Sequence, residues 1–412
     1  MLSAYFPPEI GSAAHLFHDL GRAFVERGYA VTVLTGFPSY HVDKEKDERR
    51  SRPALWRRET MNGLRVLRVR SFRLPRRVPL LRGLDQVVFS GALALSGSTL
   101  LPGFFDIILT YSPPLFLGLS AQILRRLKKA KTILNVQDLF PQSAIDLGLL
   151  NNKALIGLFR AVEAYLYKKS DAVTVHSAGN RSHVLRRGGD DRRTGVIPNF
   201  VDTREIRPGA RYNSFRKRHG IREEEYLVSF AGVIGLSQDI DVILDAAARL
   251  KALDPMAFLI VGDGLEKPRL VGKASGMTNV RFLPMLSKEE YAELLPASDI
   301  SLVTLRKEVQ TPVVPSKIMS IMAAGRPVVA SLPLAGDSSK LIDEAKSGIC
   351  VPPESPDHLA QAILRLYENS ALAEELGRNG RSYVEEHFSI DVCAGAYEKM
   401  FRELLPGRHV KE

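Results

Sequence analysis

The segment Pro315-Ser316-Lys317 precedes an apolar run at residues 318–324 and has residue types suited to holding an anion. The apolar run predicts a helix, whose first N–H groups and positive dipole end stabilise a nearby phosphate or diphosphate. The ammonium of Lys317 adds a point charge that stabilises negative charge on a departing group. We therefore predict that Ser316 and Lys317 bind an anion and that Lys317 also assists catalysis. An ordinary helix start with a surface lysine is the alternative interpretation.

Glycine turns follow two predicted strands in the second half of the chain, one turn at Gly232 and the other at residues 262–264. Because glycine has no Cβ, such turns let a nucleotide approach the main chain at the end of a parallel strand. A plain strand-to-helix turn is the alternative for residues 262–264. Gly262, Asp263 and Gly264 are therefore predicted to bind a nucleotide.

Two further candidates lie in the first half of the chain. Gly11-Ser12 opens the first predicted helix, where free N–H groups face an anion, although Ser12 is equally suited to a simple N-cap role. Asp138 follows a predicted strand at residues 132–136, and a carboxylate at that position orients or deprotonates a hydroxyl group. A helix N-cap or a loop hydrogen bond is the alternative for Asp138.

Short apolar runs alternate with amphipathic helical segments along the chain, which is typical of parallel sheets covered by helices. The predicted fold class is α/β, with two Rossmann-like doubly wound domains at residues 1–200 and 201–390. The terminal helical segment 391–412 is expected to return to the first domain. Since such sheets bind ligands beyond the carboxyl ends of their strands, we predict a cleft between the domains. The predicted strands are residues 2–6, 30–35, 107–110, 132–136, 172–176, 195–197, 226–231, 257–261, 280–283, 300–303, 327–330 and 348–351.

The composition, with 45% hydrophobic and 25% charged residues, is that of an ordinary globular protein. The two cysteines, Cys350 and Cys393, form no disulfide framework, so a reducing compartment such as the cytoplasm is expected. No signal peptide is visible, and no uncharged apolar run reaches the roughly 20 residues of a spanning helix. We interpret residues 86–105 as a buried or interfacial helix. Because the chain begins inside its first predicted strand, we expect a few residues upstream of Met1.

Positive charge concentrates in the first half, where residues 1–200 hold 30 Lys and Arg against 16 Asp and Glu. Residues 49–82 hold twelve basic residues and a single acid, Glu59. Such a stretch binds nucleic acid, an anionic bilayer or only water. The absence of a known nucleic-acid-binding signature argues against the first. Interleaved apolar residues favour an anionic membrane surface: Leu55, Trp56, Leu64, Val66, Leu67, Val69, Phe72, Leu74, Val78, Leu80 and Leu81.

No histidine–carboxylate cluster indicates a metal site. The pair of aspartates in Asp239-Ile240-Asp241 has the spacing of a metal motif. It lies at the expected start of a helix, where acidic residues suit the dipole. We therefore expect no obligatory metal and no cofactor.

The order of motifs along the whole chain resembles glycosyltransferase family 4, whose fold is the two-domain GT-B architecture. The resemblance is strongest to bacterial surface-polysaccharide members of the colanic-acid and N-acetyl-L-fucosamine transferase type. It is carried by Phe6-Pro7-Pro8-Glu9-Ile10-Gly11-Ser12, Val136-Gln137-Asp138-Leu139-Phe140-Pro141, Ile197-Pro198-Asn199-Phe200-Val201-Asp202, Phe230-Ala231-Gly232, Val261-Gly262-Asp263-Gly264, Val314-Pro315-Ser316-Lys317 and Met322-Ala323-Ala324-Gly325-Arg326-Pro327.

The resemblance implies a retaining transfer of a sugar from a nucleotide-sugar, with UDP favoured over GDP, in a peripheral enzyme at the inner face of a membrane. It implies a polyprenyl-diphosphate-linked acceptor and the synthesis of a surface polysaccharide. It also implies that the donor is bound by Gly232 and Gln238, and that its base is held at Phe282 and Leu283 largely through main-chain contacts. The chain departs from the family at Val233 and Ser237, where an arginine and a lysine are common. It also lacks two glutamates, whose places hold Pro312 and Ser320. These departures put the recognition of the donor ribose in doubt.

Two other functions stay open at this point. A nucleotide-sugar epimerase of the same fold needs no membrane contact, so the stretch 49–82 argues against it. A catalytically silent scaffold subunit is compatible with the departures from the family. A nicotinamide-dependent oxidoreductase is disfavoured, because no Gly-x-Gly-x-x-Gly motif follows the first strand.

Overall fold

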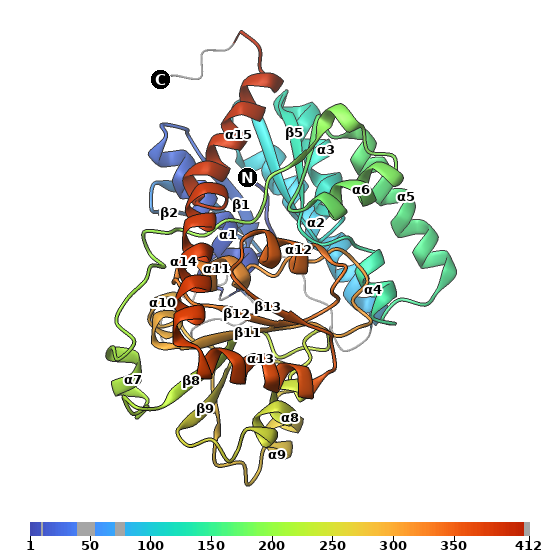
Figure 1. Cartoon of the computed structure of the whole chain (residues 1–412). Helices are drawn as coiled ribbons and strands as arrows, with labels where there is room; N and C mark the ends of the chain where they lie inside the picture. Colours follow the sequence, from blue (N-terminus) through green and yellow to red (C-terminus); the bar gives the residue numbers. More distant parts are fainter. Residues whose placement is uncertain (10, 39–53, 71–78, 408–412) are drawn as a thin grey trace. The chain divides into compact units, whose positions relative to one another are not determined.

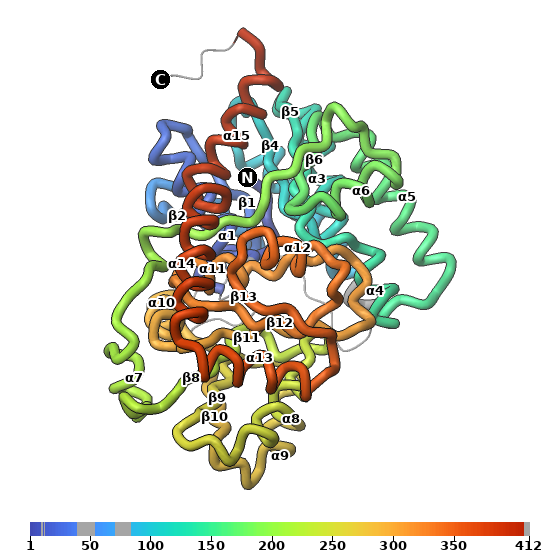
Figure 2. Tube along the Cα trace, viewed as in Figure 1, coloured from blue at the N-terminus to red at the C-terminus, as the bar shows by residue number. Residues whose placement is uncertain are grey.

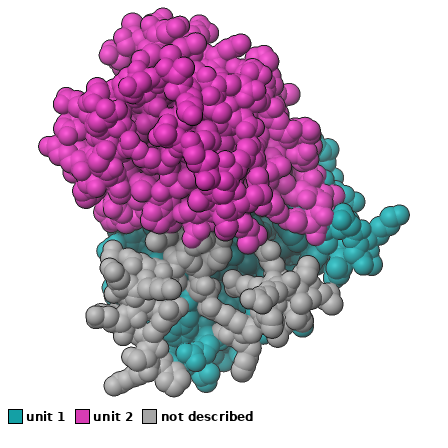
Figure 3. All heavy atoms as spheres, turned by 90° about the horizontal axis from the view of Figure 1, so that it is seen from below, with its two compact units in different colours: residues 1–144, 150–198, 390–412 teal, residues 145–149, 199–389 magenta. Residues whose placement is uncertain are grey.

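The computed structural model describes residues 1–9, 11–38, 54–70 and 79–407 (Figure 1). The chain divides into two compact units (Figure 3). Unit 1 comprises Met1–Ala144, Leu150–Pro198 and Ile390–Glu412. Unit 2 comprises Ile145–Leu149 and Asn199–Ser389.

The described strands of unit 1 form two hydrogen-bonded groups, which Leu2 near the start of the chain connects. One group has the order β1-β3-β2 and the other β4-β5-β6-β7. Leu2 bridges Leu34 of β1 and Thr110 of β4, so the strand predicted at residues 2–6 is reduced to one bridging position. Among the described strands of unit 1, only β2 runs antiparallel to its neighbour. The bounds are β1 (Thr32–Gly36), β2 (Trp56–Met61), β3 (Leu64–Val69), β4 (Ile107–Ser112), β5 (Lys131–Val136), β6 (Ala172–Val175) and β7 (Thr194–Val196).

Helices cover both faces of this sheet. The C-terminal helix α15 (Ile390–Leu404) lies beside α1 (Ser12–Glu26), with the rings of Phe401 and Phe24 5.2 Å apart (Figure 2). The Tyr397 hydroxyl reaches the sheet and accepts a hydrogen bond from Asn135 at 2.8 Å. The C-terminal helix therefore completes unit 1. The other helices are α2 (Pro79–Leu100), α3 (Leu117–Lys128), α4 (Gln142–Asp146), α5 (Lys153–Lys169) and α6 (Ala178–Arg186).

The hairpin of β2 and β3 was not predicted, and it changes the interpretation of the basic stretch. Leu64, Val66, Leu67 and Val69 are buried in unit 1. The prediction that they face a lipid surface is therefore wrong, because β3 pairs with β1 inside the sheet and is covered on both faces. Residues 49–53 and 71–78 of the stretch lie outside the described residues.

Unit 2 holds one parallel sheet with the order β10-β9-β8-β11-β12-β13, the strand order of a Rossmann fold. Its strands are apolar and largely buried, as expected for strands covered on both faces. The predicted fold class, with two doubly wound α/β units, is confirmed. The strands are β8 (Tyr226–Ala231), β9 (Met256–Val261), β10 (Val280–Leu283), β11 (Ile300–Thr304), β12 (Val328–Ser331) and β13 (Gly348–Val351). The helices are α7 (Ser214–Arg218), α8 (Asp241–Arg249), α9 (Lys267–Lys273), α10 (Lys288–Ala297), α11 (Lys317–Ala323), α12 (Asp337–Glu344), α13 (Pro356–Glu368) and α14 (Ser370–His387).

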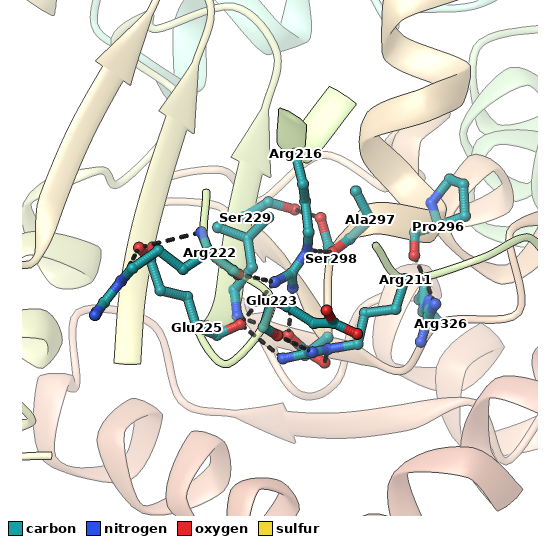
Figure 4. Close-up of polar contacts among 12 residues, drawn as sticks. Arg211, Arg216, Arg222, Glu223, Glu225, Ser229, Pro296, Ala297, Ser298 and Arg326 are labelled. Atoms are coloured by element: carbon teal, nitrogen blue, oxygen red, sulfur yellow. Dashed lines mark hydrogen bonds and ion pairs between the residues drawn. The ribbon is translucent and has the colours of Figure 1, made fainter. Parts of the chain in front are cut away.

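A buried arginine ties the amino ends of β8 and β11 together (Figure 4). The side chain of Arg216 is fully buried and donates to Asp299 at 2.9 Å, to the Ala297 carbonyl at 2.9 Å and to the Glu225 carbonyl at 2.8 Å. Arg211 donates to the other Asp299 oxygen at 2.5 Å. Burial lowers the pKa of Arg216 from its ordinary value. The cluster balances the buried charge and supplies partners for strand ends that lack them.

Replacing Arg216 with methionine should destabilise the protein by about 3–5 kcal/mol, because the carboxylate of Asp299, which is only 11% exposed, loses a partner. Urea unfolding followed by circular dichroism measures the change. The matched control is Arg249→Met, which removes an exposed pair with Asp357 and should lose at most about 1 kcal/mol. Equal losses in the two variants would contradict the role given to the buried cluster.

Candidate functional site

Lys317 begins α11 and lies among side chains from the carboxyl end of β8 and the loop after it. Its Nζ atom stands 3.8 Å from the centre of the Phe230 ring and 3.2 Å from Oε1 of Gln238. Burial lowers the pKa of Lys317 to about 7. The ring face and the amide oxygen both favour the charged ammonium, but they do not fully replace water. An anion bound next to Nζ would therefore stabilise the charged form of Lys317.

Gly232 leaves the space that the lysine occupies. A Cβ at Gly232 would stand 2.7 Å from Nζ of Lys317, and the residue has a φ of +154°. Gly232, Gln238 and Lys317, which the sequence predicts as separate candidates, are thus in one place. Phe230 was missed because a buried aromatic on a strand is usually core. Its place at the site is seen only in the structure, where the ring lies next to Nζ of Lys317.

The turns after β8 and β9 pack directly on one another. A Cβ at Gly262 would lie 1.8 Å from the carbonyl oxygen of Gly232, and one at Gly264 would lie 2.2 Å from that of Ile234. The Ile234 N–H donates to the Asp263 carbonyl at 2.9 Å. Both glycines are therefore required by close backbone approach, as the sequence predicts, but the approaching group here is another loop.

The other predicted donor residues are engaged within unit 2. The Asp263 carboxylate accepts the Gly264 N–H at 2.9 Å and remains exposed. The half-buried side chains of Phe282 and Leu283 pack against the core. Binding of a base there would rely on the main chain, as the family resemblance implies, and this stays a prediction.

Lys267 was missed by the sequence analysis. Its Nζ donates to the carbonyls of Gly262 at 2.7 Å and Leu283 at 3.0 Å. Lys267 thereby links the carboxyl ends of β9 and β10 and holds the glycine turn that follows β9. Pro268 marks the helix start, so a lysine before it resembles a surface residue in the sequence.

Ser316 precedes α11 and makes no side-chain cap of that helix. Its carbonyl accepts the Ser320 N–H at 3.3 Å. Because α11 has seven residues, its dipole adds little, and Lys317 supplies most of the positive charge at this edge. The role of Ser316 in anion binding stays a prediction.

Gly11 occupies the N-cap position of α1, so the alternative that Ser12 is the N-cap is wrong. Ser12 is the first helical residue because the helix hydrogen bonds begin with the His15 N–H donating to the Gly11 carbonyl at 3.1 Å. A Cβ at Gly11 would meet no described atom within 4 Å. Binding of an anion by the first N–H groups of α1 stays a prediction.

Asp138 lies between β5 and α4 at the carboxyl edge of the unit 1 sheet, and it is exposed. Within the described part of the chain its carboxylate has no hydrogen-bond partner, which disfavours the N-cap alternative. Desolvation raises the pKa of Asp138, although water at the exposed carboxyl screens much of this effect. The charge of Asp138 also contributes, after burial, to raising the pKa of Tyr111, so the two groups lie close together. Tyr111 was missed because it reads as a strand residue.

Arg68 holds the loop that leads to Gly11. It is buried, donates to Glu59 at 2.6 Å and to the Gly36 carbonyl at 3.3 Å, and also bonds the Pro7 carbonyl. One member of the basic stretch is therefore a structural residue of the candidate acceptor side. Its neighbours along β3 gave no sign of this in the sequence.

Asp241 is engaged by cations. Its carboxylate bonds Arg269 and Lys273, and hydrogen bonding from Arg269 lowers the pKa of Asp241 to about 2. Asp239 is buried and accepts the Val242 N–H at 3.3 Å. The residues act at the start of α8, as expected from the sequence. In the ranges that the structure describes, no group of three or more His, Cys, Asp or Glu is placed to hold a metal.

Two doubly wound units, each with candidate residues at the carboxyl edge of its sheet, define a glycosyltransferase of the GT-B class. The family described as "Glycosyl transferase 4-like domain" matches residues 11–199, and "Glycosyl transferases group 1" matches residues 225–369. The chain belongs to glycosyltransferase family 4. It is accordingly a retaining enzyme that uses a nucleotide-sugar donor.

Similar proteins support this assignment along most of the chain. The glycosyltransferase WbjE of Pseudomonas aeruginosa is 27% identical over 73% of this chain and 75% of its own length. WcaI of Escherichia coli K12, a glycosyl transferase assigned to colanic acid biosynthesis, is 25% identical over 90% of this chain and 93% of its own. The structure of Anabaena HepE in complex with UDP-glucose has a TM-score of 0.72 at 16% identity, covering 98% of this chain and 100% of HepE.

Replacing Gly262 with alanine should remove donor binding and destabilise unit 2 by at least about 2 kcal/mol, because the added methyl group collides with the Gly232 carbonyl. Calorimetric titration with UDP-glucose and urea unfolding measure the two effects. Gly272→Ala is the matched control, since a Cβ there meets nothing within 4 Å and α9 tolerates alanine. Normal donor affinity in the Gly262 variant would contradict the packing argument.

Donor affinity should depend on pH through Lys317. Below pH 7 the lysine is already charged, so its titration leaves the dissociation constant unchanged. Above pH 7 the free protein must take up a proton to bind the diphosphate, so the dissociation constant should rise by up to about tenfold per pH unit. Titration of UDP-glucose between pH 6 and 9 tests this, because its diphosphate does not titrate there. Lys317→Met should abolish the pH dependence of the dissociation constant. If this variant kept the pH profile of the wild type, Lys317 would not be the titrating group.

Proposed function

We propose that this protein transfers a sugar from a UDP-sugar to a polyprenyl-diphosphate-linked sugar during the synthesis of a cell-surface polysaccharide such as an O-antigen, capsule or exopolysaccharide. The observation that carries the proposal is the half-buried Lys317 beside Gln238, Phe230 and Gly232. HepE, which shares the fold, binds UDP-glucose, and WcaI is assigned to colanic acid biosynthesis. Both support the choice of donor and pathway class.

In the proposed reaction, Lys317 meets the diphosphate of the donor in unit 2. The bond between the anomeric carbon and the diphosphate oxygen breaks, and its electron pair leaves with the diphosphate. The ammonium stabilises this growing charge more in the transition state than in the ground state, which accelerates the step. The role needs no metal and no enzyme nucleophile.

The acceptor hydroxyl attacks the same face of the anomeric carbon that the diphosphate leaves, so configuration is retained. Asp138 in unit 1 orients this hydroxyl and is the proposed acceptor of its proton. Its exposed carboxylate, with no partner in the described residues, is free for this purpose. Gly11 and Ser12 begin α1 at the same sheet edge and are proposed to bind a phosphate of the donor or acceptor.

The proposed location is the inner face of the cell membrane, where polyprenyl-linked acceptors are available. None of the described helices is long and apolar enough to cross a bilayer. The stretch 49–82 is proposed to contribute to peripheral contact through exposed members such as Leu55 and Trp56. Most of its other described apolar residues belong to the core.

Nucleotide release tests the proposed function. Purified protein is incubated with a panel of UDP- and GDP-sugars, with and without a membrane extract containing lipid-linked sugars. Release should require both one UDP-sugar and the extract. Lys317→Ala should lower the rate by at least about 100-fold, and Asp138→Asn should lower it by a similar factor.

Matched controls separate these effects from general damage. Lys340→Ala and Asp254→Asn change exposed residues of the same types and should retain the wild-type rate. Interconversion of the donor without any acceptor would instead indicate an epimerase. Nucleotide binding without turnover of any donor would indicate a silent scaffold subunit, which the departures at Val233 and Ser237 keep in view.

A further inference from the structure

The helices α2, α3 and α5 are neighbours in unit 1 (Figure 1), and each carries exposed apolar side chains. In α2 the exposed residues follow helical spacing, from Leu84 through Val87 to Leu95, which is 67% exposed. This outward apolar set is separate from the buried core beneath the helices. Its members are Leu84, Val87 and Leu95 of α2, Ile123 and Leu127 of α3, and Leu158 and Tyr165 of α5.

Exposed carboxylates are absent from the described side chains of these three helices. The acidic residues there are Asp85 and Glu163, and both are buried. Glu163 accepts a hydrogen bond from the Tyr167 hydroxyl at 3.0 Å and contacts His183 at 3.1 Å. Among the described side chains of these helices, the exposed charged groups are therefore all basic. A face that meets water alone usually mixes both charge signs.

A basic pocket lies at the C-terminal ends of α3 and α5. It has a volume of about 480 Å³, and Tyr165 and Gln122 form part of its wall. Within the described part of the chain, Arg125 and Lys131 are the only cations of the pocket that pair with a carboxylate, that of Asp171, at 3.1 and 3.4 Å. The cations that line it are Arg125, Arg126, Lys129, Lys131 and Lys169.

An apolar residue adjoins the pocket. Nζ of Lys129 stands 5.1 Å from the centre of the Phe104 ring, and Phe104 is 71% exposed. Leu127, between two pocket residues on α3, is also exposed. Cations and apolar side chains therefore alternate along the same edge, which is the pattern of a surface that enters a lipid interface.

Helix-end electrostatics explain only part of this charge. Basic residues at the end of a helix stabilise its last carbonyls. Arg125 does so by donating to the Lys169 carbonyl at 2.8 Å, and Lys128 donates to the Ser98 carbonyl at 3.1 Å. Arg126 and Lys169 make no such side-chain bond to any described residue and line the pocket. Their charge remains available to an external anion.

We propose that the face of α2, α3 and α5 lies on an anionic bilayer, with the basic pocket holding the phosphate of a lipid headgroup. Phe104, Leu95 and Leu127 enter the interfacial layer beside it. The pocket lies at the amino ends of the unit 1 strands, whereas Asp138 lies at their carboxyl edge, so the two sites are distinct. The helix α2 starts after the carboxyl end of β3 and ends before the amino end of β4. It therefore extends from one edge of the unit 1 sheet to the other, and a bilayer along its exposed side would also lie near the candidate acceptor residues at the carboxyl edge.

Binding to lipid vesicles tests the charge in this proposal. Each basic residue near an anionic surface contributes about 1 kcal/mol, a factor of about five. Arg126→Gln combined with Lys129→Gln should therefore weaken partition into vesicles containing phosphatidylglycerol by about 30-fold, with little binding to phosphatidylcholine alone in either protein. The matched control, Lys251→Gln with Arg378→Gln, makes the same charge change on exposed residues of unit 2 and should bind as the wild type does.

The depth of insertion distinguishes this face from the stretch 49–82. The only tryptophan of the chain, Trp56, lies on β2 in that stretch and is 45% exposed. A second reporter is made by Phe104→Trp in a Trp56→Phe background. Brominated lipids should quench the fluorescence of the new tryptophan strongly. Quenching at Trp56 alone would overturn the proposed face.

Other outcomes also decide the matter. Equal vesicle binding by the pocket variant and the control would overturn the proposal. So would binding of glycerol phosphate to the pocket without any loss of vesicle binding, because the pocket would then hold free phosphate and not a lipid headgroup. The proposal that this membrane contact serves a transferase rests on the proposed function, but vesicle binding is measured without donor or acceptor. Normal vesicle binding without sugar transfer would therefore count against the proposed function alone.

Discussion

The candidate donor site depends on one close contact, that between the turns after β8 and β9. Gly262 approaches the Gly232 carbonyl so closely that no side chain fits between them. This contact sets the path of the loop from Gly232 to Gln238, and the loop in turn provides the amide oxygen that meets Lys317. Lys267 strengthens the arrangement by bonding the carbonyl of Gly262 itself. The close packing of the two turns and the hydrogen bonds of Lys267 thus hold the main chain beside Lys317.

The environment of Lys317 supports the proposal that this one cation binds the donor diphosphate. A lysine in water is strongly hydrated, and an anion must compete with that hydration. Here the ammonium faces a ring and one amide oxygen, so burial has already removed much of its water. The gain on meeting a diphosphate is correspondingly larger, and it grows further as charge develops on the leaving oxygen. The missing arginine and lysine at Val233 and Ser237 are therefore compatible with catalysis.

Much of the fold was predictable from sequence because its strands are apolar runs buried on both faces. The strands at Tyr226–Ala231 and Val280–Leu283 have the predicted bounds. The β2–β3 hairpin was missed because arginines interrupt its apolar positions, and a buried Arg68 resembles an exposed one in a sequence. Within the donor site the glycines and Lys317 were predictable from local spacing. Lys267 and Phe230 were not, since their roles depend on atoms that only the folded chain brings near.

The same limitation applies to charge, because counting basic residues does not locate them. Arg68 belongs to the stretch that seemed a membrane surface in the sequence, yet it is buried and paired with Glu59. Arg126 belongs to a helix whose sequence looks ordinary, yet it lines a pocket with four other cations. Asp85 of α2 and Glu163 of α5 are buried. They therefore do not offset those cations at the surface, although a sequence count would include them. Among the described residues of unit 1, the helices α2, α3 and α5 thus carry more positive charge at the surface than a sequence count implies, which is the basis of the proposed contact with an anionic bilayer.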